Sequence, residues 1–261
     1  MQFQDHVRDE ITTGRLSAEA VAKLLDETGL AIDELLLHLV PLAAEFASPH
    51  QSAYRVGAVG QGAGGAVYLG ANFEFQALPL NQSVHAEQAV VINATTQGET
   101  GLMRLAVSAP PCGHCRQFLN ELATASELKV ILPNTPVRRL AEYLPHAFGP
   151  QELGNPNRVL GVKPCGLSLI DDADESHIGA RQALHWASWS YAPYTNAHAS
   201  AAIRMTDGKV YAAPYLENAA FNPSLSPIHG AIVRAAFGGY KPKQIQEVIV
   251  AQRVDSMIDH R

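Results

Sequence analysis

Two short stretches of the chain carry residue types that bind metal ions and move protons. The first is Val84-His85-Ala86-Glu87, and the second is Pro110-Pro111-Cys112-Gly113-His114-Cys115. Zinc binds four ligands in a tetrahedron and accepts imidazole nitrogen and thiolate sulfur, so His85, Cys112 and Cys115 can supply three protein ligands. The fourth position is then open to water. Glu87, two residues after the histidine, is placed to exchange protons with that water.

Each stretch taken alone also has an ordinary interpretation. A histidine at a helix start is more often a satisfied polar residue than a ligand, and Cys-x-x-Cys occurs in structural zinc sites, in redox sites and by chance. The combination of His-x-Glu with a later Pro-Cys-x-x-Cys is typical of zinc deaminases, and it predicts a catalytic site. The alternative is a closed structural site in which Cys165 or His114 supplies the fourth ligand.

Composition limits the class of protein and of substrate. The chain has 261 residues, 47% of them hydrophobic and 17% charged, which is typical of a soluble globular protein. No signal peptide and no bilayer-length apolar stretch is visible, so we expect neither export nor a membrane anchor. Three cysteines, two of them in Cys-x-x-Cys, favour a reducing compartment such as the cytoplasm. A net charge of -6 without a dense Lys/Arg run opposes nucleic-acid binding and favours a small uncharged substrate.

The elements that must position these residues follow from hydrophobic periodicity. Residues 1–47 have apolar residues at helical spacing and predict a small helical N-terminal segment. Alternation over 54–59 and 66–70, around a Gly-rich turn, predicts a hairpin. Helices and strands then alternate, with a helix over 84–94, a strand over 102–107, a helix over 115–122 and a strand over 128–132. This order predicts right-handed crossovers and a largely parallel sheet between helices, with both metal-binding stretches at helix starts beyond strand ends.

The second half of the chain repeats the first in part. Residues 65–74 match residues 208–217 without a gap, and residues 84–87 match Ile228-His229-Gly230-Ala231 with one residue inserted. This copy retains His229 but has Ala231 in place of the glutamate and no Cys-x-x-Cys, so we expect one zinc per chain. The predicted domains are a helical segment (1–47), a catalytic zinc lobe (48–150), a linker with a connecting helix (151–188) and a degenerate second lobe (189–261).

Beyond the metal motif, the sequence resembles the cytidine deaminases, specifically the larger two-lobed class with a helical N-terminal segment. The resemblance covers nearly the whole chain and is carried by residues 70–75, 115–122, 144–150 and 217–223. It implies an α/β fold with a three-layer α/β/α lobe, repeated as a degenerate second lobe, and zinc-dependent deamination of cytidine and deoxycytidine in pyrimidine salvage. The chain differs from the family at two points. Tyr54 stands where a pocket phenylalanine is usual, and the sequence ends at Arg261, before the last elements expected of the second lobe.

The resemblance also assigns residues to the substrate. Asn72 and Glu74 are two residues apart at a strand end and point to one side, which by spacing alone fits an ordinary polar strand end about equally well. In the family the matching positions bind the ribose hydroxyl. Tyr54 by pattern alone is a core aromatic, and its match to a pocket aromatic implies base stacking. The resemblance also places Ala86 among the substrate-binding residues. Phe148 matches a residue that, in the family, enters the neighbouring subunit's site, which implies a homodimer.

Two thiolates cancel the charge of the zinc ion, which would make it a poorer acid, so their electron donation must be restrained by nearby groups. Cys112 and Cys115 bracket the first turn of a helix, whose free amides and positive dipole end stabilise sulfur anions, and Arg116 is placed to assist. Two other functions remain. A deaminase of nucleotides or nucleic acid would be favoured by basic residues near the site. A zinc-stabilised binding module without turnover would be favoured by a closed metal site.

Overall fold

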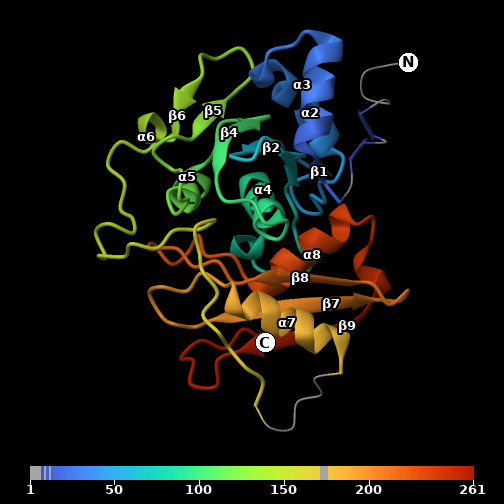
Figure 1. Cartoon of the computed structure of the whole chain (residues 1–261), viewed down its shortest axis with the longest axis vertical. Coiled ribbons are helices and arrows are strands. Elements are labelled where there is room, and N and C mark those ends of the chain that lie inside the picture. Colours follow the sequence, from blue (N-terminus) through green and yellow to red (C-terminus); the bar gives the residue numbers. More distant parts are fainter. Residues whose placement is uncertain (1–6, 9, 12, 171–175) are drawn as a thin grey trace. The chain divides into compact units, whose positions relative to one another are not determined.

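The computed structural model describes residues 7–8, 10–11, 13–170 and 176–261 (Figure 1). Contacts divide the chain into two compact units, Met1–Ala147 and Phe148–Arg261, and each is described here by itself. The finer boundaries expected at residues 47 and 188 stay predictions. Residues 1–6, 9 and 12 of the predicted N-terminal helical segment and residues 171–175 of the predicted linker lie outside the described residues. Among the described residues, no helix is both long and apolar enough to cross a membrane.

The first unit is built on a six-stranded sheet with the order β1-β3-β2-β4-β5-β6. Its strands are β1 (Arg15–Leu16), β2 (Gly57–Gly62), β3 (Val67–Ala71), β4 (Leu102–Val107), β5 (Lys129–Ile131) and β6 (Arg138–Arg139). The prediction of a largely parallel sheet is wrong, because β4 and β5 are parallel while the other pairs in this sheet are antiparallel. The connection that contains α4 joins β3 to β4, and these two strands run in the same direction. They are not neighbours, however, because the hairpin strand β2 lies between them in the sheet.

Helices cover both faces of this sheet. They are α2 (Ala18–Thr28), α3 (Ile32–Ala44), α4 (Ala86–Thr95), α5 (Gly113–Leu119) and α6 (Leu140–Tyr143), with a short 3-10 turn, η1 (Leu80–Gln82). A Cβ added to Gly57 would meet α3 at the Val40 carbonyl, whereas one added to Gly60 would meet α4 at Val90. Because these two strand positions are an odd number of residues apart, they face opposite sides of β2. The sheet therefore separates α3 from α4, and the predicted α/β class with a three-layer lobe is confirmed.

A very close contact between a helix and the sheet lies under the first turn of α4. A Cβ built on Gly70 of β3 would lie 2.2 Å from the Ala86 carbonyl oxygen and 2.6 Å from the Val90 amide nitrogen. Any side chain at this position would force the backbones apart, so the glycine allows α4 to rest directly on β3. This contact fixes the height of the N-terminus of α4 above the sheet.

The second unit repeats part of this arrangement around a three-stranded antiparallel sheet of order β8-β7-β9. Its elements are α7 (Ile178–Ser188), β7 (Ala199–Met205), β8 (Val210–Pro214), α8 (Pro227–Phe237), η2 (Pro242–Gln244) and β9 (Ile245–Gln252). The helix expected around residues 180–187 is confirmed as α7, which packs on β7 through a hydrogen bond that the Ser200 hydroxyl donates to the Ala183 carbonyl. By strand register Ser200 occupies the position of Gly57, and α7 that of α3.

Candidate functional site

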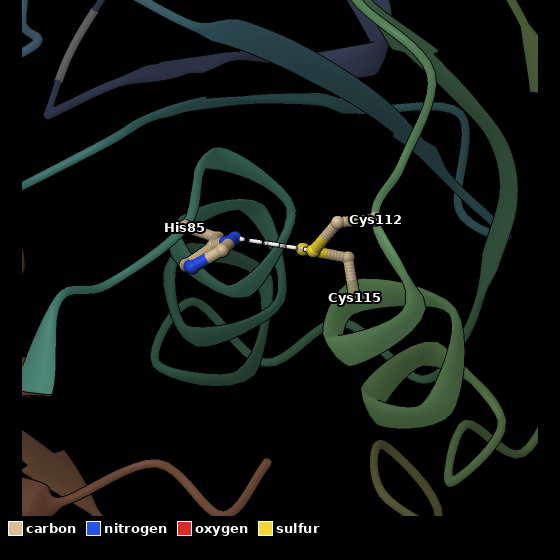
Figure 2. Close-up of side chains that lie close together, drawn as sticks. All are labelled: His85, Cys112 and Cys115. Carbon is tan, nitrogen blue, oxygen red and sulfur yellow. Dashed lines mark hydrogen bonds between the residues drawn. The ribbon is translucent and has the colours of Figure 1, made fainter. Parts of the chain in front are cut away.

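Three side chains of the first unit meet at the starts of two neighbouring helices (Figure 2). His85 is the N-cap of α4, and its backbone amide donates to the Gln88 side chain at 3.1 Å, which fixes the first turn. Cys112 is the N-cap of α5, and Cys115 lies in its first turn. The Cys112 sulfur lies 3.5 Å from the His85 Nδ1 and 3.6 Å from the Cys115 sulfur, and the Cys115 sulfur lies 3.3 Å from the same Nδ1.

This triangle of donor atoms matches the requirements of zinc. A tetrahedral ion with the usual Zn–S and Zn–N bond lengths requires separations of roughly 3.5–3.8 Å between its ligand atoms. The observed separations of 3.3–3.6 Å agree within a few tenths of an ångström. The sulfur–sulfur distance of 3.6 Å is far longer than a disulfide bond of about 2.05 Å, so both cysteines are free to bind metal.

The composition of the cluster distinguishes between an open and a closed metal site. Within the described residues, one group of at least three metal-ligand side chains has its donor atoms all within 4.8 Å of one another, and it consists of His85, Cys112 and Cys115. His114, the candidate fourth ligand within the first unit, does not belong to this group, although its ring stacks on His85 with centroids 4.9 Å apart. Three protein ligands leave one coordination position for a reacting group, which is the arrangement of catalytic zinc sites.

The electrostatics of the cluster favour a thiolate even without metal. The pKa of Cys112 is lowered to about 3, because hydrogen bonds with Cys115 and His85 stabilise the sulfur anion. The backbone amide of Cys115 adds a smaller contribution, as expected of a helix start. The pKa of His85 is raised, chiefly by its contact with Cys112, and the pKa of Cys115 is raised by its hydrogen bond with Cys112. Metal binding would therefore release protons from His85 and Cys115.

His114 and Arg116, the two residues on either side of Cys115, differ in their hydrogen bonding. The pKa of His114 is lowered by burial, and its Nε2 is buried without a hydrogen-bond partner. Arg116 donates to the carbonyl of Pro111 at 2.7 Å and to that of Tyr143 at 3.2 Å, and its guanidinium lies over the Tyr143 ring. Arg116 therefore braces the turn that carries the cysteines. The largest shifts in the pKa of the two thiols come instead from contacts between the cysteines, from His85 and from burial.

Glu87 is the second residue of α4 and is 4% exposed. Its pKa is raised, because burial disfavours the charged carboxylate, and a hydrogen bond with Cys115 opposes this shift in part. The structure therefore brings Glu87 against the metal-binding cluster, in the protein interior. A buried carboxyl group with a raised pKa is a group that can both accept and return a proton near neutral pH.

Three of the proposed substrate residues are joined by hydrogen bonds. The Asn72 side chain donates to the Tyr54 carbonyl at 2.9 Å and accepts from the Val56 amide at 2.9 Å. Glu74 accepts from the Ser52 hydroxyl at 2.5 Å, and Tyr54 is 60% exposed, so it is not a core aromatic. Phe73, between Asn72 and Glu74, pairs through its backbone with Val84, directly before His85. This bridge connects the Tyr54–Asn72–Glu74 group to the metal-binding helix start.

Ala86 and Phe148 are placed differently. Ala86 is 1% exposed in the first turn of α4, with its carbonyl against Gly70. Phe148 begins the second unit and is 47% exposed. Of the predicted substrate residues, the structure therefore joins Tyr54, Asn72 and Glu74 into one group, whereas Ala86 lies beside His85 at the start of α4 and Phe148 belongs to the second unit.

Comparison with known proteins agrees with this geometry. A family model described as the cytidine and deoxycytidylate deaminase zinc-binding region matches residues 30–131, and a second model of the same description matches residues 140–261. A cytidine deaminase of Photobacterium profundum is 41% identical over 94% of this chain and 82% of its own length. A cytidine deaminase of Cronobacter sakazakii is 39% identical over 98% of this chain and 85% of its own length. The chain belongs to the cytidine deaminase family.

Among solved structures, a cytidine deaminase of Mycobacterium tuberculosis is 33% identical, with a TM-score of 0.42, over 46% of this chain and 99% of its own length. The family assignment rests on the sequence matches. The His85–Cys112–Cys115 cluster falls within the zinc-binding region of the cytidine deaminase family, and zinc, one ion per chain, is therefore the cofactor that the donor set and the family agree on.

The second family match covers a unit whose described residues contain no such cluster. The structure also corrects the sequence alignment of His229 with His85. Leu216 pairs with Leu225 as Phe73 pairs with Val84, so Ser226, the N-cap of α8, takes the position of His85. The connection in the second unit is shorter, not longer, and His229 is the third residue of the helix, at the position of Gln88 in α4. The second unit thus lacks even the histidine ligand.

Sequence reasoning missed the residues that hold Glu74. The Ser52 hydroxyl and the backbone amides of Gln51 and Ser52 all donate to this carboxylate. A signal was available, because Thr195 precedes Glu217 by the same number of residues as Ser52 precedes Glu74. Extending the internal repeat upstream of residue 65 would have revealed this hydroxyl in both copies.

Proposed function

We propose that this chain catalyses the hydrolytic, zinc-dependent deamination of cytidine and deoxycytidine to uridine and deoxyuridine, with release of ammonia, as a step of pyrimidine salvage. The observation that carries the proposal is the triangle of His85, Cys112 and Cys115 with the buried Glu87 against it. Family membership supports the reaction class, and the relatives matched over most of their length are named cytidine deaminases.

In this proposal His85, through Nδ1, and the two cysteine sulfurs hold the ion. When bound, zinc supplies a Lewis acid that lowers the pKa of water toward neutrality. The Glu87 carboxylate takes a proton from the attacking water and delivers it to the ring nitrogen beside the carbon that carries the amino group. It then takes the remaining proton of the added hydroxyl and delivers it to the departing amino group. One water enters and one ammonia leaves, so Glu87 ends in its starting state.

The Tyr54–Asn72–Glu74 group would bind the rest of the nucleoside. The Asn72 amide retains one hydrogen and Glu74 retains room for a further donor beyond the three bonds it accepts. Both suit sugar hydroxyls. The exposed Tyr54 ring offers a face on which the base can stack. The Glu74 carboxylate also repels a phosphate group nearby, which favours nucleosides over nucleotides.

We further propose that the enzyme acts in the cytoplasm as a homodimer, without nucleic-acid or membrane partners. Three free cysteines support a reducing compartment. The exposed Phe148, whose family counterpart enters a neighbouring subunit's site, supports pairing of two chains. Ala86 would contribute to the substrate site from the first turn of α4, beside His85.

An ultraviolet assay of the purified, zinc-loaded protein tests this proposal. Cytidine should lose the absorbance of its aminopyrimidine ring while ammonia is released in equal amount. Turnover of cytidine monophosphate or of cytosine in single-stranded DNA, with none of cytidine, would move the assignment to a nucleotide or nucleic-acid deaminase. Zinc binding without turnover of any of these substrates would leave a zinc-stabilised binding module.

A further inference from the structure

The Ser52 hydroxyl connects two parts of the proposed substrate site. It donates to Oε1 of Glu74 at 2.5 Å and accepts from the backbone amide of Tyr54 at 3.0 Å. The other carboxylate oxygen of Glu74 accepts from the amides of Gln51, at 2.6 Å, and of Ser52, at 3.0 Å. The Ser52 hydroxyl is also the largest cause of the lowered pKa of Glu74, so it bonds best to the charged carboxylate.

The second unit contains the same set of hydrogen bonds. The Thr195 hydroxyl donates to Oε1 of Glu217 at 2.6 Å and accepts from the amide of Ala197 at 3.2 Å. The other carboxylate oxygen accepts from the amides of Tyr194, at 2.7 Å, and Thr195, at 3.3 Å. Each donor of this set is separated from its counterpart in the first unit by the same sequence offset that relates Gly57 to Ser200 in the two hairpins.

The surroundings of the two sets differ in the features that a substrate would need. Ala197 and Tyr215 stand in the second unit at the positions of Tyr54 and Asn72. Glu217 is 1% exposed, whereas Glu74 is partly exposed. The described part of the second unit has no metal-binding cluster. The hydroxyl–carboxylate pair therefore holds a loop against a strand end in either unit, and in the first unit the carboxylate is accessible and the exposed ring of Tyr54 stands where the second unit has Ala197.

We propose that Ser52 is a positioning residue of the deaminase site, which holds the Glu74 carboxylate toward a sugar hydroxyl and ties it to the backbone of Tyr54. This inference rests on the proposed function. A carboxylate on a strand end has several rotamers, and the hydroxyl selects one of them while leaving a lone pair free for the substrate. Since the same hydroxyl accepts the Tyr54 amide, the sugar-binding and base-stacking residues are held in one fixed relation.

The chain provides its own matched controls for this role. Ser52→Ala removes the hydroxyl in the first unit, Thr195→Ala removes it in the second, and Ser52→Thr installs the residue that the second unit uses at this place. We expect Ser52→Ala to raise KM for cytidine roughly tenfold, the scale of one weakened charge-assisted hydrogen bond, with kcat changed by less than about threefold. Thr195→Ala should leave KM unchanged, and Ser52→Thr should restore it.

A substrate analogue separates positioning from general loosening of the site. The dideoxy analogue of cytidine lacks the secondary hydroxyls that Glu74 would bind, so its KM should respond to Ser52→Ala much less than that of cytidine does. Zinc content and melting temperature are measured on every variant. If Ser52→Ala does not accumulate as folded protein, Ser52→Cys, with a weaker donor, gives the same comparison.

Several outcomes would overturn the inference. Equal rises in KM for cytidine and its dideoxy analogue would show that Ser52 maintains the site in general. Lower melting temperatures for both alanine variants, with KM for cytidine unchanged, would show that the hydroxyl is structural in both units. Failure of the proposed function itself is distinguishable, because the unaltered zinc-loaded protein would then not deaminate cytidine at all.

Discussion

The substitution Glu87→Gln would separate proton transfer from the other properties of the site. Glu87 is 4% exposed in the first turn of α4, and burial raises its pKa. Glutamine has nearly the same shape and length, so the helix start and the metal-binding cluster can keep their geometry. The amide cannot accept a proton from water, so both proton transfers assigned to this position should fail.

The expected magnitudes differ for activity and for stability. One positioned proton transfer contributes roughly 10²–10⁴-fold, and Glu87 would act twice, so we expect kcat/KM to fall at least about 10³-fold, or about 4 kcal/mol. The thermal stability of the metal-free variant, by contrast, should not fall. A carboxyl group whose pKa is raised on folding stabilises the folded state at low pH, and this contribution is lost as the pH rises through the folded pKa. At neutral pH the buried carboxylate therefore costs stability, and the metal-free variant should melt at the same temperature as the unaltered protein or higher.

The assay combines three measurements on one preparation. Loss of cytidine absorbance gives activity, elemental analysis gives zinc per chain, and thermal unfolding in a chelator gives the stability of the metal-free protein. Glu99→Gln is the matched control, because it makes the same change beyond the opposite end of α4, where Glu99 accepts from the Tyr68 hydroxyl. This control should retain full activity.

Two results would refute the reasoning. A Glu87→Gln variant with one zinc per chain and activity within about tenfold of the unaltered protein would show that another group moves the protons. A variant that loses its zinc would show that Glu87 maintains the metal site, and its role could not be limited to proton transfer.

Three further predictions concern substrate, metal and pH. Cytidine and deoxycytidine should be deaminated with specificity constants far above that of cytidine monophosphate, because the Glu74 carboxylate repels a phosphate dianion, and comparable constants would contradict this role. Elemental analysis and light scattering on one sample should give one zinc per chain and the mass of a dimer, whereas two zinc ions per chain or an active monomer would oppose the account. A pH series of kcat/KM should fall on the acid side, since Glu87 must be ionised to accept a proton, with a midpoint above the usual glutamate value of about 4.3. An acid limb at or below that value would show that the protein does not raise this pKa in the working enzyme.

The sequence was most informative where chemistry fixes both residue type and spacing. The types and spacing of His85, Cys112 and Cys115 predict one metal site, and the structure brings their donor atoms within 3.6 Å of one another. The strand over residues 102–107 was predicted at its observed limits, because its apolar run is bounded by turn signals. The second helix begins at Gly113, before the predicted start at Cys115, since an N-cap cysteine has no strong sequence signature.

Other features could not be read from local patterns. An alternation of strands and helices gives the direction of successive strands but not which strands are neighbours, so the insertion of β2 between β3 and β4 was missed. The partners of Glu74 lie in an irregular loop, where hydrogen bonds have no periodicity. The alignment of His229 with His85 was wrong because it matched similar residues across the loop before the helix, and this loop differs in length between the two units.

The contact between Gly70 and the first turn of α4 also distinguishes the two units. In the second unit the register places Ala213 at the position of Gly70, so a methyl group now stands where the first unit tolerates none. A helix that carries a metal ligand needs a defined distance from the sheet, whereas α8, whose N-cap is Ser226, has no ligand to hold. A methyl group at Gly70 would therefore displace a metal-binding helix start, while the same group at Ala213 lies under a helix start that binds no metal.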